Sequence, residues 1–242
     1  MDEKRPTRSL RLLHTSDLHL GCDYLADLPR RAIRRVVDLA RALDVDALVL
    51  AGDVFDHNRV AEGEVACLID ELARFPKASI ILPGNHDCYD DGSVYRRSDF
   101  ARRPARIHLL DGAEEHLLLP DLDLAVWGRP VIDHCREFRP LVGVPSTWQA
   151  SWRVVMGHGQ FELPSTRDPR SSPIFPDDIA SANCDYVALG HWDVCVDVSQ
   201  GGIVAFYSGS PHHGNRRRGL SEVLLVTFDP ATGVSTDRLP LT

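Results

Sequence analysis

No apolar run in the sequence approaches the roughly 18 residues that a membrane-spanning helix requires, and the first nine residues, MDEKRPTRS, are charged and polar. The pattern gives no support to secretion or membrane insertion, so we expect a cytoplasmic protein with no membrane partner. The six cysteines are scattered, and none belongs to a Cys-x-x-Cys pair. This spacing argues against a disulfide framework or a structural zinc site and is typical of reduced thiols.

Lysine is also scarce, because only Lys4 and Lys77 occur and every other basic residue is arginine. Arginine binds phosphate in a bidentate manner, although genome composition could produce the same bias. The formal net charge of −8 repels polyanions at long range. Bulk charge therefore predicts no non-specific affinity for nucleic acid, although a local basic patch could override the repulsion.

The length of 242 residues and the hydrophobic content of 43% suit a folded protein with a sizeable core. No internal repeat, low-complexity segment or convincing linker is evident. We therefore expect a single domain over residues 1–242, with no separate capping domain.

The first third of the chain alternates strand-like and helix-like patterns. Three apolar segments of strand length are separated by two segments in which apolar residues recur at helical spacing. In chain order these segments are 9–17, 27–44, 46–53, 59–75 and 78–87. A βαβαβ order predicts a parallel sheet with right-handed crossovers.

The rest of the chain is richer in strands. We expect short strands at the edge of the domain, then longer apolar strands, a short helix at 176–183 and a surface loop at 160–178, which is rich in Pro and Ser. The expected strands are 105–110, 122–128, 152–159, 184–193, 203–210 and 221–229. Two strand-rich halves favour one domain with two sheets.

Side chains that can bind metal ions stand at the ends of five of these strands. Asp17 and His19 are two residues apart, which in an extended chain places both on one side. Asp53 follows a glycine, and the third strand ends in Asn85-His86-Asp87; the set continues in the second half with His158, His191 and Asp193. Ligands bind beyond the carboxyl ends of strands in such sheets, so we expect one shared crevice. Oxygen and nitrogen donors without thiolate favour Mn, Fe or Zn.

Five ordered blocks, SDLHLG, AGDVFD, PGNHD, GHG and GHWD, together resemble the calcineurin-like metallophosphoesterase superfamily. The resemblance runs from Leu10 to about Phe228 and implies an α/β fold, a four-layer α/β/β/α sandwich of two mixed sheets flanked by helices. The stretches LLHTSDLHLG and FYSGSPHHG further resemble the Mre11/SbcD branch of DNA-repair nucleases.

The resemblance also implies a ligand set for two divalent metal ions, with Mn²⁺ favoured and Fe or Zn as alternatives. Asp17, His19 and Asp53 would bind the first ion, and Asp53 would bridge to the second, which Asn85, His158 and His191 would complete. Asp193 stands where the family has histidine. It either still binds the first ion or leaves that site weak, and then His212 or His213 could fill the gap.

A catalytic pair is expected next to these ligands. A phosphodiester needs two cations to neutralise its oxygens and a proton for its leaving alkoxide. His86 lies one residue beyond a ligand and would act as the general acid. Asp87 would orient His86 and favour its imidazolium form.

Substrate contacts are expected from His57, Trp192, Arg216 and Arg217. Each also has a simpler explanation: a turn residue for His57, core packing for Trp192, and a solvated loop for the two arginines. The remaining histidines, which are His14, His108, His116 and His134, are expected to be strand, surface or edge residues.

The predicted function is metal-dependent hydrolysis of phosphodiester bonds, with nucleic acid as substrate and an SbcC/Rad50-like ATPase as partner. Two alternatives stay open at this point. One is a phosphodiesterase or phosphomonoesterase of nucleotides or other small esters, and the other is a homologue that binds metal without turnover.

Overall fold

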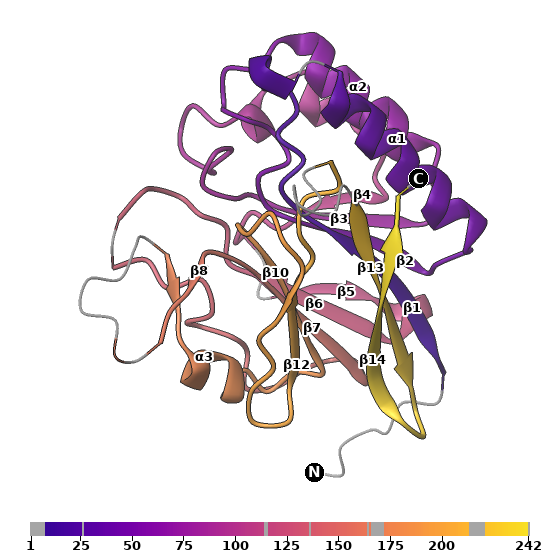
Figure 1. Ribbon diagram of the computed structural model, residues 1–242, viewed down its shortest axis with the longest axis vertical. Coiled ribbons are helices and arrows are strands. Elements are labelled where there is room, and N and C mark those ends of the chain that lie inside the picture. The colour runs from indigo at the N-terminus through magenta and orange to yellow at the C-terminus, as the bar shows by residue number, and fades with distance from the viewer. Residues whose placement is uncertain are drawn as a thin grey trace.

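The computed structural model of the protein describes residues 8–25, 27–113, 116–135, 137–163, 165, 172–212 and 221–241. Two six-stranded sheets pack face to face in these ranges, and a helical layer covers the outer face of the first (Figure 1). The two sheets are mixed, and the fold class predicted from the sequence is confirmed.

The first sheet has the strand order β14-β13-β1-β2-β3-β4. Strands β1 to β4 are parallel, whereas β13 pairs antiparallel with β1 and with β14. The bounds are β1 (Leu10–Thr15), β2 (Ala47–Ala51), β3 (Ala78–Leu82), β4 (Ile107–Leu109), β13 (Glu222–Asp229) and β14 (Gly233–Pro240). The parallel strands end at one common edge, which is the edge that carries the first three motif blocks.

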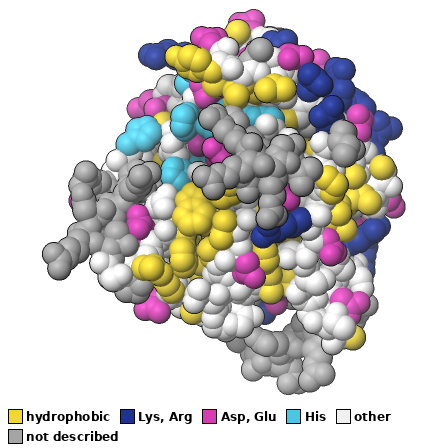
Figure 2. All heavy atoms as spheres, in the orientation of Figure 1, with side chains coloured by type: hydrophobic (Ala, Val, Ile, Leu, Met, Phe, Trp, Pro, Cys, Tyr) yellow, Lys and Arg dark blue, Asp and Glu magenta, His cyan; other side chains and the backbone are white. Residues whose placement is uncertain are grey.

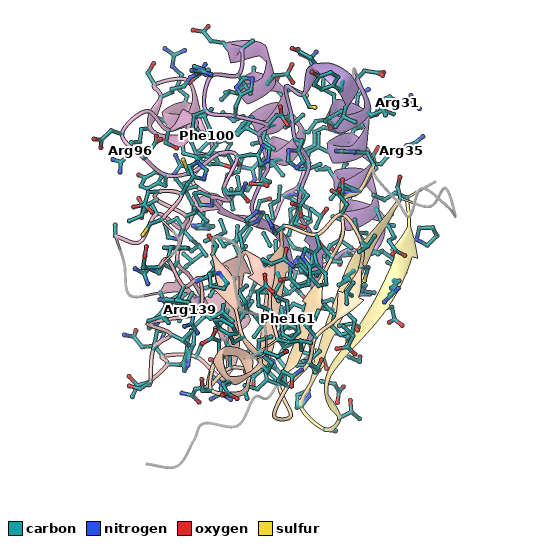
Figure 3. The ribbon with its side chains drawn as sticks, turned by 60° about the vertical axis from the view of Figure 1, so that its left-hand side comes forward. Arg31, Arg35, Arg96, Phe100, Arg139 and Phe161 are labelled. Atoms are coloured by element: carbon teal, nitrogen blue, oxygen red, sulfur yellow. The ribbon has the colours of Figure 1, made fainter. Side chains whose placement is uncertain are left out.

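Helices α1 (Leu28–Ala42) and α2 (Glu62–Ala73) cover the outer face of this sheet. α1 buries Ile33, Val36 and Val37 against the strands, as their helical spacing predicts. Its arginines stay on the outer side, where Figure 3 labels Arg31 and Arg35. Short 3₁₀ helices follow at η1 (Asp23–Leu25), η2 (Val94–Arg96) and η3 (Phe100–Arg102).

The second sheet has the strand order β11-β12-β10-β7-β6-β5. Its central four strands are parallel, and β5 and β11 pair antiparallel at the two edges. The bounds are β5 (Leu117–Leu119), β6 (Leu124–Gly128), β7 (Trp152–His158), β10 (Tyr186–Gly190), β11 (Val196–Asp197) and β12 (Val204–Tyr207).

The outer face of the second sheet has a thinner cover than the first. It is covered by loops, by the short helix α3 (Pro176–Ala180) and by the strand pair β8 (Gln160–Phe161) and β9 (Pro173–Ile174). The 3₁₀ helix η4 (Pro120–Leu122) instead packs Leu122 against the layer between the sheets. In Figure 3, Arg139 and Phe161 mark this side, away from α1. An ion pair in which Nη2 of Arg139 donates to both carboxylate oxygens of Asp178 ties the loop before β7 to α3.

Several expectations from the sequence need correction. The segment 160–178 is not all loop, because its ends form β8, β9 and the start of α3, while residues 164 and 166–171 lie outside the described residues. Strand β14 has no counterpart among the predicted strands.

All six cysteines are free. Over the ranges described, no helix is both long enough and apolar enough to span a membrane.

One polar pair lies inside the apolar layer between the sheets. His14 in β1 is fully buried, and its Nδ1 lies 2.8 Å from the hydroxyl oxygen of Tyr186 in β10. Burial lowers the pKa of His14 to about 3, only partly opposed by a hydrogen bond to the backbone of Leu189. A protonated His14 is therefore incompatible with this core.

The buried histidine predicts acid sensitivity of the fold. The pKa of His14 in the folded protein lies below the ordinary value of 6.5. Above pH 6.5 the ring is therefore neutral in both the folded and the unfolded protein, and the fold keeps its full stability. This stability is lost on the order of 1 kcal/mol per pH unit as the pH falls toward about 3. In urea unfolding between pH 7 and 5, the double variant His14→Leu/Tyr186→Phe should lose less stability than the natural protein.

The single variant Tyr186→Phe is the matched control, since it keeps the titrating ring and should keep the acid sensitivity. An equal loss of stability in all three proteins would show that His14 has no part in it.

Candidate metal centre

The carboxyl ends of strands from both sheets meet at one place, between the two layers. Candidate ligands follow β1, β2, β3, β7 and β10 there, as the strand-end pattern predicts. Figure 2 shows histidine side chains gathered next to acidic ones in the upper part of the visible face. The buried members of the set are Asp17, Asp53 and His158, at 1–2% exposure.

The backbone at the site is left-handed at four candidate ligands. Asp17, His19, Asp53 and His191 have φ angles of 54°, 50°, 51° and 107°. The chain at Asp17 and His19 is therefore not extended as expected, because β1 ends at Thr15, although the two side chains do face the same place. Left-handed non-glycine residues are uncommon and cluster at functional sites.

Glycines give the histidines room at this edge. A side chain on Gly52 would place its Cβ 2.1 Å from Nδ1 of His158, and one on Gly190 would meet the carbonyl oxygen of Ala51 at 1.9 Å. Both contacts are far below van der Waals distance. Gly52, the residue before Asp53, therefore allows the His158 ring of the second sheet to lie close to the backbone.

The donor atoms form two groups that share Asp53. Its Oδ2 lies 3.2 Å from Nε2 of His158 and 4.0 Å from Nε2 of His19. The ligand atoms of Asp17, His19 and Asp53 all lie within 4.8 Å of one another, and so do those of Asp53, His158 and His191. A single carboxylate in both groups is the arrangement that a pair of bridged ions needs.

Asn85 lies in the second group. Its Oδ1 is 3.0 Å from Nε2 of His158 and 3.0 Å from Nδ1 of His191. The two rings meet edge to face, with centroids 5.4 Å apart. The backbone N–H of His191 donates to the Asp17 carboxylate at 3.0 Å, which links the two groups.

The opposite ring nitrogens of two histidines are held by acceptors. Nδ1 of His158 donates to the carbonyl oxygen of Ala51 at 2.9 Å, and Nδ1 of His19 lies 3.1 Å from Oδ1 of Asp56. In both rings Nε2 is the nitrogen left to face Asp53. Histidines that bind metals are usually oriented in this way by a second partner.

The charges at the site are tightly coupled. Burial lowers the pKa of His158, but the charge and hydrogen bond of Asp53, the charge of Asp17 and the hydrogen bond to Ala51 together outweigh it and raise the pKa to about 10. Burial raises the pKa of Asp53, but His158 holds it well below its usual range. Burial raises the pKa of Asp17 to about 6, a rise that His158 opposes. The site is built around negative charge that a cation must balance.

These residues fit two divalent metal ions. The donors are carboxylate, amide and imidazole, a set suited to Mn²⁺, Fe or Zn²⁺. Asp17, His19 and Asp53 could hold one ion, and Asp53, Asn85, His158 and His191 could hold the other.

Asp193 is not brought into either group. Its side chain is exposed, and it belongs to none of the clusters found among the residues the structure describes. His212 instead lies beside the first group, with Nε2 2.6 Å from the carbonyl oxygen of Leu18. His213, the other replacement considered, lies outside the described residues.

The role expected for Asp87 needs correction. This carboxylate is fully buried and accepts hydrogen bonds from the backbone N–H groups of Val54, Phe55 and Gly84 at 2.9, 3.1 and 2.7 Å. The Tyr95 hydroxyl also donates to it. Asp87 therefore fastens the loop after β3 to the loop after β2, and the contacts of the His86 ring lie elsewhere.

Asp56 has the position next to His86 that was expected for Asp87. Nδ1 of His86 donates to the carbonyl oxygen of Asp56 at 2.9 Å and lies 3.9 Å from its carboxylate. Since a carbonyl only accepts, Nε2 is the nitrogen that can exchange a proton. The residues His19, Asp56 and His86 form a third cluster. Asp56 lies in the AGDVFD block, three residues after Asp53, which is a signal that could have identified it.

Two of the four residues expected to contact substrate, His57 and Trp192, lie in the part of the chain that the structure describes. His57 is exposed, and its Nδ1 accepts from the backbone N–H of Arg59. Trp192 stacks on Tyr207 at 4.5 Å and donates to Gln160, so one of its faces is used in packing. Arg216 and Arg217 lie outside the described residues.

Comparison with known proteins identifies the family. The model of the calcineurin-like phosphoesterases matches residues 10–195, and the chain belongs to this family. This membership agrees with the donor set of the metal centre.

Individual relatives are more distant. The chain is 34% identical over 88 residues to the DNA double-strand break repair protein Mre11 of Methanosarcina mazei, which covers 33% of this chain and 14% of the relative. It is 25% identical over 203 residues to the uncharacterized metallophosphoesterase YhaO of Bacillus subtilis, covering 75% and 48%. The chain thus spans less than half the length of both curated relatives.

A solved structure shares the fold. The protein TT1561 of Thermus thermophilus superposes with a TM-score of 0.60 at 13% identity, over 97% of this chain and all of that one. At this identity the likeness concerns the fold alone.

The geometry predicts that Asp53 and Asp193 differ in their effect on metal binding. Asp53→Asn removes the charge shared by both groups and should weaken Mn²⁺ binding by more than about a hundredfold in calorimetric titration of chelator-stripped protein. Asp193→Asn is the matched control and should change the affinity little. Equal losses in the two variants would place Asp193 in the metal shell.

Proposed function

We propose that the protein is a dinuclear-metal phosphodiesterase that uses Mn²⁺ and acts on DNA. The observation that supports this most is the buried Asp53 carboxylate, shared by two groups of donors. The similarity to a DNA double-strand break repair protein favours DNA as the substrate.

The proposed chemistry divides between the ions and the protein. When bound, two divalent ions neutralise the phosphate oxygens and activate the attacking water. The task left to the protein is the leaving group, an alkoxide that needs a proton. His86 is suited to it because its side chain is 45% exposed, whereas Asp53 is buried and His19 and Asn85 are only partly exposed.

Asp56 prepares His86 for this task. Its carbonyl oxygen binds Nδ1, so Nε2 carries the proton that leaves. Its carboxylate lies 3.9 Å from the same Nδ1 and stabilises the positive ring before the transfer. The same carboxylate orients His19, at 3.1 Å, so that one side chain serves a ligand and the acid together.

The acid role predicts a dependence on the leaving group. His86→Ala should lower kcat on a short DNA strand by about a hundredfold or more, because the alkoxide is then unprotonated. On bis(p-nitrophenyl) phosphate the loss should be much smaller, since nitrophenolate leaves without a proton. Rates are compared at saturating Mn²⁺, with metal content measured for both proteins. Equal losses on both substrates would contradict the acid role.

Asp56→Asn should lower kcat on the same DNA strand by about tenfold, since the carboxylate acts through His86 and His19. Asp90→Asn is a control from the same rim, where the carboxylate contacts Asn58 and Gly92. An unchanged rate in Asp56→Asn would mean that the Asp56 carbonyl alone positions His86.

The choice of DNA is tested by competition. A labelled DNA strand and p-nitrophenyl phosphate are offered together to the Mn²⁺-loaded enzyme, with Asp53→Asn as the inactive control. Faster cleavage of DNA is the expected result. Preference for the monoester would replace the DNA assignment with the small-ester alternative while leaving the metal centre in place.

A further inference from the structure

Arg129 is the first residue after β6, and it lies at the same edge of the fold as the metal centre. Strands β6 and β7 are parallel, and Gly128 lies opposite Met156, two residues before His158. The carboxyl ends of the two strands therefore meet at this edge. Arg129 belongs to none of the five motif blocks, so the family resemblance gives it no role.

The loop after β6 is fastened to the loop that carries the ligand and the general acid at 85–86. The backbone N–H of Val131 donates to the carbonyl oxygen of Pro83 at 3.3 Å, and the N–H of Tyr89 donates to the carbonyl oxygen of Val131 at 2.7 Å. These two bonds lie on either side of residues 85–86. Arg129 is thus two residues away from a point that is fixed to the metal centre.

The Arg129 side chain extends over an aromatic ring at this rim. The central carbon of its guanidinium lies 4.9 Å from the centroid of the Phe138 ring. Phe138 belongs to a small buried cluster with Cys88, in the loop after β3. Pro140, two residues later, lies 3.0 Å from where a Cβ on Gly159 would be, in the loop after β7. The cation is therefore placed beside both loops that supply ligands to the second group.

Arg129 differs from the other half-buried arginines because it donates no hydrogen bond. Five others are half-buried in the part of the chain that the structure describes, and each donates to a carboxylate or a backbone carbonyl. These are Arg97, Arg103, Arg106, Arg139 and Arg153. Within the same ranges, the guanidinium of Arg129 has no acceptor and no carboxylate at ion-pair distance, and its one contact is the ring.

Arg139 shows that contact with a ring does not satisfy a guanidinium in this protein. Its central carbon lies 4.7 Å from the centroid of the Phe175 ring, and Nη2 also donates to Asp178. A guanidinium has five N–H donors, and the face of a ring leaves them available. Arg129 has the ring of this arrangement without the acceptor.

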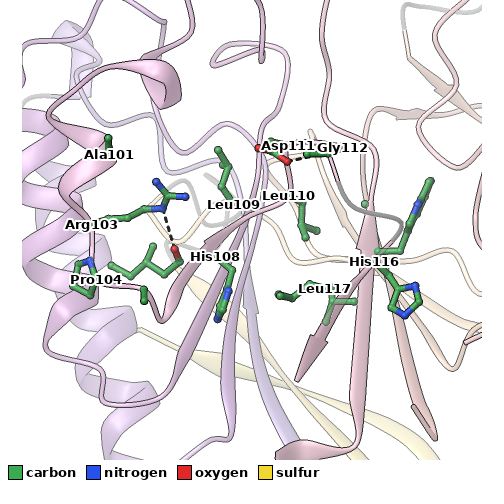
Figure 4. A pocket seen from close by; sticks show the side chains of 16 residues that line it. Ala101, Arg103, Pro104, His108, Leu109, Leu110, Asp111, Gly112, His116 and Leu117 are labelled. Carbon is green, nitrogen blue, oxygen red and sulfur yellow. Dashed lines mark hydrogen bonds between the residues drawn. The ribbon is translucent and has the colours of Figure 1, made fainter. Parts of the chain in front are cut away.

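Arg103 is the half-buried arginine nearest in the fold to the end of β6, and it is already used. It lines a cavity of about 430 Å³, where its Nε donates to the carbonyl oxygen of Ile107 at 2.9 Å (Figure 4). Asp111 and Gly128 line the same cavity, whereas Arg129 does not. The donors of Arg129 are therefore not directed to this cavity.

A phosphate is the acceptor that these donors fit. Phosphate oxygens accept two parallel N–H bonds from one guanidinium, which gives both charge and geometry. The metal centre accounts for one phosphate, the one whose ester bond is broken. In a nucleic-acid strand the next phosphate lies one nucleotide away, beyond the ligands and at the rim, where Arg129 stands.

We propose that Arg129 binds a phosphate adjacent to the one that is cleaved, so that the enzyme favours a strand with several phosphates over an isolated phosphodiester. The inference rests on the proposed function, because it takes the metal centre to hold the scissile phosphate.

Binding is measured first, by fluorescence anisotropy of a labelled oligothymidylate with chelator-treated protein, in which no cleavage occurs. Arg129→Met keeps an unbranched stem over Phe138 and removes the charge. It should weaken binding by about tenfold or more, and it should lower the slope of log affinity against log salt by about 0.7, the value for one phosphate contact on a single strand.

Arg35→Met is the matched control, because Arg35 is exposed on the outer side of α1 (Figure 3). It removes the same charge far from the rim and should change neither the affinity nor the slope. Arg129→Lys keeps the charge without the fork of donors, so its affinity should lie between those of the natural protein and Arg129→Met. It also serves as the test if thermal unfolding shows that Arg129→Met does not fold.

Cleavage is then compared on two substrates of the Mn²⁺-loaded enzyme, a thymidine dinucleotide with one phosphodiester and a trinucleotide with two. The natural protein should have the lower KM on the trinucleotide. Arg129→Met should remove this advantage by raising the KM of the trinucleotide about tenfold, with a smaller effect on its kcat, because the lost contact holds the substrate equally before and during reaction.

The two assays separate this inference from the proposed function. An unchanged affinity in Arg129→Met, or equal losses in Arg129→Met and Arg35→Met, would overturn the proposal even if the enzyme cleaves DNA. Binding that depends on Arg129 without any cleavage would retain the phosphate site and contradict the proposed function. A natural protein that neither binds nor cleaves the strand would contradict both.

Discussion

The Asp53 carboxylate is the constraint on which the site depends. A charge buried to 2% exposure needs partners, and those partners come from both sheets: His19 and the backbone of His86 from the first, and His158 from the second. The Asp53 carboxylate therefore links the edges of the two sheets at this place. A divalent ion on each side of Asp53 meets the same need and adds the chemistry of phosphoester hydrolysis.

The backbone around this carboxylate is kept in unusual conformations. Four candidate ligands have positive φ, at a cost of about 1–3 kcal/mol each, which the surrounding sheets must support. Asp87 contributes to that support by binding two loops through three backbone N–H groups. The donors are thus positioned before any metal or substrate arrives, and this pre-organisation favours a catalytic site over a flexible binding loop.

The sequence predicted much of this arrangement and missed specific parts. The order of strands and helices along the chain followed from apolar periodicity. The convergence of the strand ends followed from the motif blocks. The extended geometry at Asp17 and His19 was wrong, because residue spacing does not report the sign of φ. The pairing of Asp87 with His86 was also wrong, since adjacency in sequence does not determine which loop supplies a partner. Strand β14 was missed because its alternating exposed residues are polar and it lies at a sheet edge.

The dinuclear centre is tested most directly by the positions of the ions. Crystals soaked in Mn²⁺ should give two anomalous-difference peaks roughly 3.5–4 Å apart, one on each side of the Asp53 carboxylate. One peak should lie against Asp17 and His19, and the other against Asn85, His158 and His191. A single peak, or two peaks that do not share Asp53, would contradict a bridged dinuclear centre and the phosphodiesterase mechanism built on it.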